Sequence, residues 1–189
     1  MFGHTEVKGS SVMIAPIFIK EKFGEDSYKL WLEKLSPEAK KDFEMGILIS
    51  KWYPVLTHFS YPIQLICELF YKGDMKGAWE SGYFGAQYSL KGIYASVIKI
   101  FSIETVISKS PILFTTSWRP SELKVIEHNK FSAIVHITKF PEITKYIEVA
   151  IAGYITYMGE ATGIKNVNIK ITKSMAAGDQ YTEYSCTWI

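Results

Sequence analysis

The sequence predicts an α+β fold, with a helical N-terminal half and a four-stranded or slightly larger antiparallel sheet in the C-terminal third. Two observations predict it. Apolar residues recur every three or four positions up to about residue 101, and an alternation of period two takes over after residue 120. A chain of 189 residues, 48% of them hydrophobic, is also long enough to bury one core, so we expect a single domain over residues 1–189.

A short helix is predicted within SPEAKKDFEMG, residues 36–46. Ser36 is a suitable N-cap, Pro37 fits the first helical position, and Gly46 stands just past the end. These three residues supply a complete start and stop signal for the helix.

A long helix with one apolar face is predicted from Met75 to Phe101. Apolar residues recur at steps of three and four, at Trp79, Tyr83, Ala86, Leu90, Tyr94 and Val97. Gly82, Gly85 and Gly92 interrupt this stretch. Because glycine allows another backbone to come close, we expect the helix to lie against the sheet or against a second subunit.

The C-terminal third is predicted to run strand, strand, helix, strand, strand. ELKVIEH and FSAIVHITKF flank a turn at residues 128–130 and form a hairpin. The next segment has a helical apolar face and ends at Gly163. Two further strands alternate apolar and polar residues on either side of a turn at Gly178 and Asp179.

Composition and charge exclude several classes of function. The net charge is only +2 and the lysines are scattered, so we expect no nucleic-acid partner. Cys67 and Cys186 lack any metal-ligand spacing and are expected to be buried, reduced thiols of a cytoplasmic protein. No signal peptide and no uninterrupted apolar stretch of membrane-spanning length is found, so we expect no membrane span.

Several motifs together resemble a known family. They are EVKGSSV near the start, KWYPV at Trp52 to Val55, LKGIYASVIKIFSIETVISKSP at Leu90 to Pro111, and a closing S-x-x-x-G-D-x-x-T-x-Y. In this order they resemble the 4-vinyl-reductase-like domain superfamily, and especially its short stand-alone bacterial proteins of unassigned function. This superfamily shares a ligand-binding fold with heme-nitric-oxide-binding domains and with small subunits of a Golgi trafficking complex.

The resemblance also locates metal positions, which this chain fills differently. The family's closing motif carries two cysteines, and in this sequence Ser174 and Thr182 stand there; Ile171 stands where phenol-sensing members have a carboxylate. Hydroxyl groups without thiolate or imidazole are poor zinc ligands. The heme-binding relatives need an axial histidine on a helix and a Tyr-x-Ser-x-Arg motif, whereas this chain has YSCTW. We therefore expect no metal and no cofactor.

No catalytic motif is found, so no catalytic residue is proposed and a non-catalytic protein is favoured over an enzyme. Aromatic residues make up 15% of the chain, and most are expected to fill the core. Some could instead line a pocket between the long helix and the sheet. The candidate ligand-binding residues are Tyr83, Tyr88, Trp118, Tyr154 and Tyr157. Replacing Trp118 with alanine is expected to weaken ligand binding without disturbing the fold.

The sequence thus favours a stand-alone sensory or ligand-binding domain for a small hydrophobic or aromatic molecule. An internal pocket of roughly 300 Å³ or more would support this function. The alternatives are a protein-interaction scaffold resembling the trafficking subunits, and an accessory or catalytic subunit in tetrapyrrole metabolism. A homodimer is also expected, because an apolar stripe at residues 63–70, extended by Ile17, Phe18 and Phe23, would otherwise be exposed.

Overall fold

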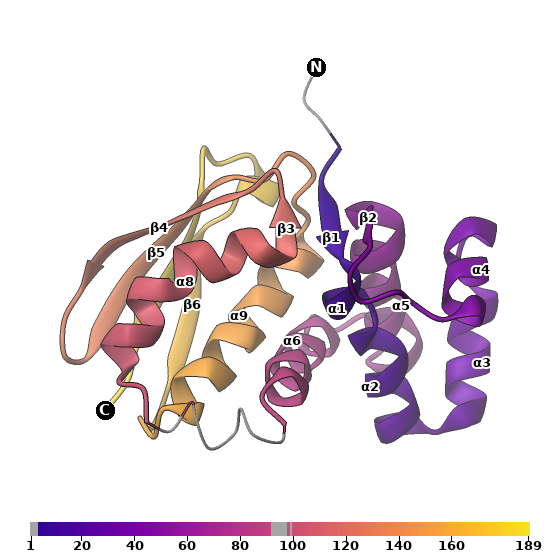
Figure 1. The fold of residues 1–189 in the computed structure, drawn as a ribbon, viewed down its shortest axis with the longest axis horizontal. Coiled ribbons are helices and arrows are strands. Elements are labelled where there is room, and N and C mark those ends of the chain that lie inside the picture. Colours follow the sequence, from indigo (N-terminus) through magenta and orange to yellow (C-terminus); the bar gives the residue numbers. More distant parts are fainter. Residues whose placement is uncertain (1–3, 92–97, 99) are drawn as a thin grey trace.

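The computed structural model describes residues 4–91, 98 and 100–189. Figure 1 shows a helical N-terminal part on one side of the molecule and a sheet with two long helices on the other, with one helix, α6, between them. The structure is α+β, with a four-stranded antiparallel sheet in the C-terminal part, and the predicted fold class is confirmed.

The N-terminal part consists of short elements. They are β1 (Glu6–Lys8), α1 (Gly9–Val12), α2 (Ile14–Phe23), α3 (Glu25–Glu33), α4 (Pro37–Met45), β2 (Trp52–Pro54), the π-helical turn η1 (Leu56–Ser60), α5 (Tyr61–Phe70) and α6 (Lys76–Ser89). The helix predicted from Ser36 is confirmed as α4: the Ser36 hydroxyl accepts a hydrogen bond from the Ala39 amide at 3.3 Å.

The long helix predicted up to Phe101 is wrong. Helix α6 ends at Ser89, and a second helix, α8 (Ile103–Ser117), starts after Ser102, whose hydroxyl accepts a hydrogen bond from the Thr105 amide. The predicted helix positions Tyr94 and Val97 lie outside the described residues. Helix α8 was not predicted, since Pro111 in its interior is a residue that usually ends a helix.

The C-terminal third agrees with the prediction. It contains β4 (Glu122–His128), β5 (Ser132–Lys139), α9 (Lys145–Ala161), β6 (Asn168–Lys173), the short 3₁₀ turn η2 (Met175–Ala177) and β7 (Thr182–Thr187). The strands pair antiparallel in the order β4-β5-β7-β6. A second, small sheet in the order β2-β1-β3, with β3 at Trp118–Arg119, was not predicted, because its strands are only two or three residues long.

Helices α6 and α9 pack closely because two glycines face each other's backbone. A Cβ built on Gly82 would overlap the carbonyl oxygen of Ala150, and one built on Gly153 would overlap the carbonyl oxygen of Trp79. The absence of side chains at these two positions sets the distance between the helices. The predicted close backbone approach of Gly82 is therefore to α9, a neighbouring helix of the same chain.

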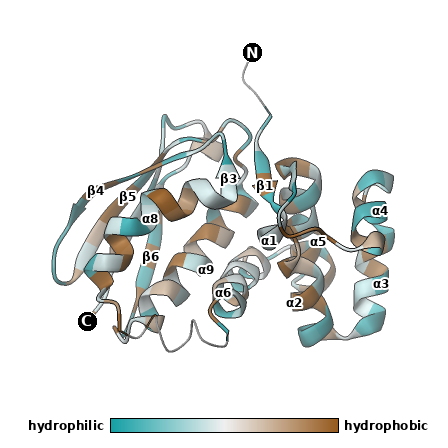
Figure 2. Ribbon diagram, viewed as in Figure 1, coloured by the Kyte–Doolittle hydropathy of each residue, from teal (hydrophilic) through white to brown (hydrophobic). Residues whose placement is uncertain are grey.

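One core of buried side chains runs from the helical part into the sheet, and Figure 2 shows hydrophobic segments within α2 and α9 and a hydrophilic α4. This core includes most of the stripe on which the expected homodimer rested, and Ile63 belongs to a small second cluster of buried side chains. Ile63, Leu65, Ile66 and Phe18 are buried, and the half-buried Phe23 and Phe70 stack on each other with ring centres 4.6 Å apart. The expectation that this stripe is exposed is wrong, because the two helices that carry it, α2 and α5, pack inside the molecule.

Candidate ligand cavity

A cavity of about 270 Å³ lies between three helices and the inner face of the four-stranded sheet. Helix α6 contributes Gly82 and Gly85, α8 contributes Ile107 and Phe114, α9 contributes Ile151 and Tyr154, and the sheet contributes Val135 and Ile169. The inward side chains of β5 and β7 reach the cavity because their apolar residues alternate along the strands, as the sequence predicted.

The cavity wall is almost entirely apolar and carries no charged side chain among the described residues. Three of its serines bond to their own helices: the hydroxyls of Ser81, Ser89 and Ser110 donate to the carbonyl oxygens of Gly77, Gly85 and Ile107 at 2.7 to 2.8 Å. The indole N–H of Trp188 is likewise used, since it donates to the Lys130 carbonyl oxygen at 2.9 Å. Few of the polar groups in the wall therefore remain for a bound molecule.

Tyr154 is the clearest polar group that faces the cavity. No hydrogen bond joins its hydroxyl to another residue in the described part of the chain, and 41% of the residue is accessible. Burial nevertheless raises the pKa of this hydroxyl. Tyr154 is both accessible and shielded from bulk water because its accessible surface faces a protein cavity rather than open solvent. The Tyr154 hydroxyl can therefore donate or accept one hydrogen bond inside the cavity.

Cys186 is the other ionisable group in the wall. Burial raises the pKa of its thiol to about 12, and its Sγ lies 3.8 Å from the Tyr184 carbonyl oxygen. The thiol is therefore protonated at neutral pH and behaves as a small apolar group.

The five candidate residues from the sequence are divided among three places. Trp118 and Tyr154 both line the cavity. Tyr83 lines a separate, more open groove with Phe18 and Trp79, and its hydroxyl donates to Glu160 at 2.6 Å. Tyr157 packs edge-on against Tyr83, and Tyr88 stacks on Phe84 beneath the Lys91 ammonium group.

Tyr83, Tyr88 and Tyr157 thus lie outside the cavity wall. The sequence could not separate them from Trp118 and Tyr154, because periodicity along α6 and α9 does not show which side of each helix faces the cavity. Of the cavity residues that sequence reasoning missed, the largest group lies on α8, a helix that was not predicted. Ile103, Ile107 and Phe114 recur there at steps of four and seven, which is the signal that could have revealed them.

Trp118 is part of the core as well as of the cavity wall. It is 7% exposed, and its ring packs edge-on against Phe59 at 4.7 Å and obliquely against Phe140 at 5.4 Å. Truncating a side chain packed in this way removes many contacts. The expectation that Trp118→Ala leaves the fold undisturbed is therefore wrong on physical grounds.

The turn between β6 and β7, residues 174–181 and called the closing turn below, encloses a buried carboxyl group. Glu148, on α9, is 2% exposed and accepts hydrogen bonds from the hydroxyls of Ser174 at 2.6 Å and Thr182 at 2.5 Å. The Ala176 amide also donates to it, at 3.2 Å. The two hydroxyl positions singled out in the sequence thus hold the turn to α9 through Glu148, while Ile171 takes no part in this contact.

Glu148 was missed because only its position in the fold, and no motif, connects it to the turn. The available signal was weak: one acid lies beside the apolar face of a helix. A buried carboxylate is stable only where donors surround it, and here all of its donors are uncharged.

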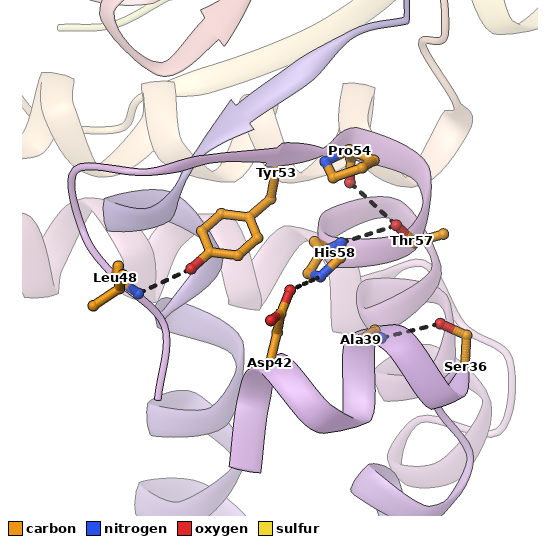
Figure 3. A network of polar contacts seen from close by, with 8 residues as sticks. All are labelled: Ser36, Ala39, Asp42, Leu48, Tyr53, Pro54, Thr57 and His58. Atoms are coloured by element: carbon orange, nitrogen blue, oxygen red, sulfur yellow. Dashed lines mark hydrogen bonds and ion pairs between the residues drawn. The ribbon is translucent and has the colours of Figure 1, made fainter. Parts of the chain in front are cut away.

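The buried histidine, His58, belongs to a network on the far side of the helical part (Figure 3). Its Nε2 lies 3.0 Å from Asp42 Oδ2, and its Nδ1 lies 2.9 Å from the Thr57 hydroxyl. These contacts join α4 to η1, and His58 does not line the cavity. It therefore acts as a buried link between two elements.

The other three histidines also lie away from the cavity wall. His136, on the outer face of β5, contacts Glu183 at 2.7 Å and stacks on Tyr181. His4 pairs with Glu142, and His128 ends β4 in an exposed position. No group of three or more histidine, cysteine, aspartate or glutamate side chains suited to a metal ion occurs among the described residues.

Comparison with solved structures shows which known proteins share this fold. An H-NOX protein from S. oneidensis in the Fe(II)NO state superimposes with a TM-score of 0.74 at 10% identity, covering 96% of this chain and 99% of that one. The Fe(II) unliganded H-NOX protein from K. algicida gives a TM-score of 0.70 at 9% identity, covering 96% of each chain. The chain has the fold of H-NOX domains.

At this level of identity the likeness concerns the H-NOX fold alone. It agrees with the ligand-binding fold that the sequence motifs implied. No protein-family model matches the sequence, and no curated protein sequence matches it. Within the described residues, no helix of this H-NOX fold is both long and apolar enough to cross a membrane.

Proposed function

We propose that this protein is a non-catalytic sensory or ligand-binding domain that holds a small hydrophobic or aromatic molecule in the cavity between α6, α8, α9 and the sheet. The apolar cavity wall is the observation that carries the proposal. An enclosed apolar space with one or two polar groups is the usual form of a small-molecule site. The H-NOX fold adds support, since one solved structure with this fold is in the Fe(II)NO ligation state.

The cavity volume limits the ligand. At about 270 Å³ the cavity lies just below the roughly 300 Å³ at which small-molecule pockets usually begin. The ligand is therefore small, about the size of two or three aromatic rings. The tyrosine hydroxyl at position 154 supplies one hydrogen bond to orient it.

Heme, which is found in the H-NOX family, does not fit this cavity. No imidazole lines it, and the Cys186 thiol is protonated, so the usual histidine and thiolate ligands for heme iron are missing there. Tyr154 and Met158 are of kinds that can ligate iron. However, no cation in the described wall balances two propionates, and a porphyrin exceeds the volume of so small a cavity.

Titration with the fluorescent apolar probe N-phenyl-1-naphthylamine tests the proposal. We expect saturable binding at one site per chain. Val135→Trp on the inner face of β5 should weaken it by tenfold or more because the indole fills the cavity, and Val106→Trp on α8 is a second filling variant. The matched control is Ile134→Trp, on the outer face of the same strand. Absence of saturable binding, or equal effects of the inner and outer variants, would overturn the proposal.

We further propose that the chain belongs to the 4-vinyl-reductase-like superfamily and forms a single domain, which the order of its motifs and the continuous core support. If the protein acts instead as an interaction scaffold, the probe should not bind saturably. The ligand titration therefore also separates these two functions.

A homodimer is also proposed, but on a different surface from the one the sequence indicated. Ile112 on α8 is 65% exposed and Ile126 on the adjoining β4 is 51% exposed, and such side chains gain from being covered. Light scattering at micromolar concentration should give twice the monomer mass of 21.5 kDa, and Ile112→Asp should reduce the measured mass to that of one monomer. A monomer mass for the unmodified protein would refute the dimer.

A further inference from the structure

We infer that the cavity selects an uncharged ligand and rejects anions, carboxylates included. This inference rests on the proposed function and deepens it, because it specifies the chemical class of the ligand. It is carried by the placement of charge in the molecule: among the described residues, no lysine, arginine, histidine, aspartate or glutamate side chain lines the cavity wall.

An arginine and a buried glutamate that stand close in sequence to wall residues illustrate this placement. Arg119 follows directly on the cavity residue Trp118, but its Nε donates to Glu6 at 2.7 Å and its guanidinium group lies 4.2 Å over the Trp52 ring. Arg119 is also the one arginine of the sequence. Glu148 stands two residues before the cavity residue Ala150, but three donors of the closing turn and the start of β7 occupy its carboxylate.

The dipoles of the wall do not replace the missing charge. The hydroxyls of Ser81, Ser89 and Ser110 donate to helix carbonyl oxygens, and the Trp188 N–H donates to the Lys130 carbonyl oxygen. A carboxylate or sulfonate inside would lose its water and find only uncharged hydroxyl groups of the described wall, such as that of Tyr154, in return. An ion that loses hydration without a partner binds poorly, whereas an uncharged molecule pays no such cost.

A matched pair of probes measures this selectivity. 1-Naphthamide and 1-naphthoate have almost the same size and shape, and at pH 7.5 only the second is charged, because carboxyl groups ionise near about pH 4. Both compete against N-phenyl-1-naphthylamine for the unmodified protein. We expect the amide to displace the probe and the carboxylate to bind at least about 100-fold more weakly.

Two lysine variants on α8 test whether missing charge is the cause. Leu113 lines the cavity and is 50% exposed, so Leu113→Lys can place an ammonium group at the cavity edge without burying it. This variant should narrow the difference between amide and carboxylate to about tenfold or less, through a charge-assisted hydrogen bond. Thr115→Lys, at an exposed position on the same helix outside the wall, should leave the difference unchanged.

The outcomes are distinct. If the two naphthalenes bind equally well to the unmodified protein, the inference is wrong while the proposed function stands. If neither naphthalene nor the fluorescent probe binds, the proposed function and the inference both fall. Should Leu113→Lys and Thr115→Lys change the ratio alike, a general surface field, and not the cavity wall, would cause the selectivity, which also overturns the inference.

Discussion

The contact between α6 and α9 can be tested with two alanine substitutions three residues apart on the same helix. A Cβ on Gly82 would overlap the Ala150 carbonyl oxygen and lie 2.6 Å from its carbonyl carbon. A Cβ on Gly85 would meet only the Ile14 side chain, at 3.4 Å, which is an ordinary contact. Gly82→Ala should therefore force the helices apart, whereas Gly85→Ala should be accepted without movement.

The magnitudes follow from two opposing effects. Replacing glycine by alanine inside a helix stabilises it by about 1 kcal/mol, and both variants receive this gain. Overpacking usually costs about 1–3 kcal/mol, and the upper end applies to Gly82 because a backbone carbonyl group cannot rotate away as a side chain can. We expect Gly82→Ala to lower the free energy of unfolding by about 2 kcal/mol, and Gly85→Ala to raise it by up to about 1 kcal/mol.

Urea unfolding followed by circular dichroism measures both values. In thermal unfolding, about 2 kcal/mol corresponds to a Tm lowered by roughly 4–8 °C for a chain of this size. Equal effects of the two substitutions, or stabilisation by Gly82→Ala, would refute the close crossing of α6 and α9. The position of two walls of the ligand cavity would then be wrong as well, since α6 and α9 form them.

Further outcomes are expected for single changes elsewhere. Trp118→Ala should lower the free energy of unfolding by about 3–5 kcal/mol in urea; an unchanged midpoint would contradict its place in the core. Thr182→Val leaves Glu148 with one donor fewer and should cost about 1–3 kcal/mol. Hydrogen bonds from the Thr172 hydroxyl, and to a lesser extent from His136, lower the pKa of Glu183. The stabilisation that Glu183 supplies is therefore present above the ordinary glutamate pKa and is lost on acidification. Between pH 7 and pH 3, the Tm of Glu183→Gln should fall by less than the Tm of the unmodified protein. The purified protein should hold no stoichiometric zinc or heme, and one equivalent of zinc by elemental analysis or a Soret band would contradict this.

Short stretches of sequence were sufficient to predict those elements whose ends or buried faces depend only on neighbouring residues. Ser36, Pro37 and Gly46 bound α4 because capping is a property of adjacent residues. The alternation through β5 and β7 predicted which side chains face inward, and Tyr184 and Cys186 are buried accordingly. The order of strands and helix in the C-terminal third could likewise be derived from the change of period along the chain.

The tertiary structure alone decided where the cavity lies and what it contains. Helix α8 forms despite Pro111, because packing against β4 compensates for the lost backbone hydrogen bond, and no local rule predicts such compensation. The stripe along α5 is equally apolar whether a second subunit or the rest of the same chain covers it, and in the structure α5 packs against α6, α3 and α2.

Glu148 and the closing turn show most clearly which features the sequence determined and which the tertiary structure decided. The sequence determined that hydroxyl groups, and not thiols, stand at residues 174 and 182. It could not show that a carboxylate 26 and 34 residues away lies between them, because that contact depends on how α9 packs across β6 and β7. Residue chemistry is fixed by the chain itself, whereas partners distant in sequence are fixed only when the helices and strands pack together, since burial and hydrogen bonding act between neighbours in space.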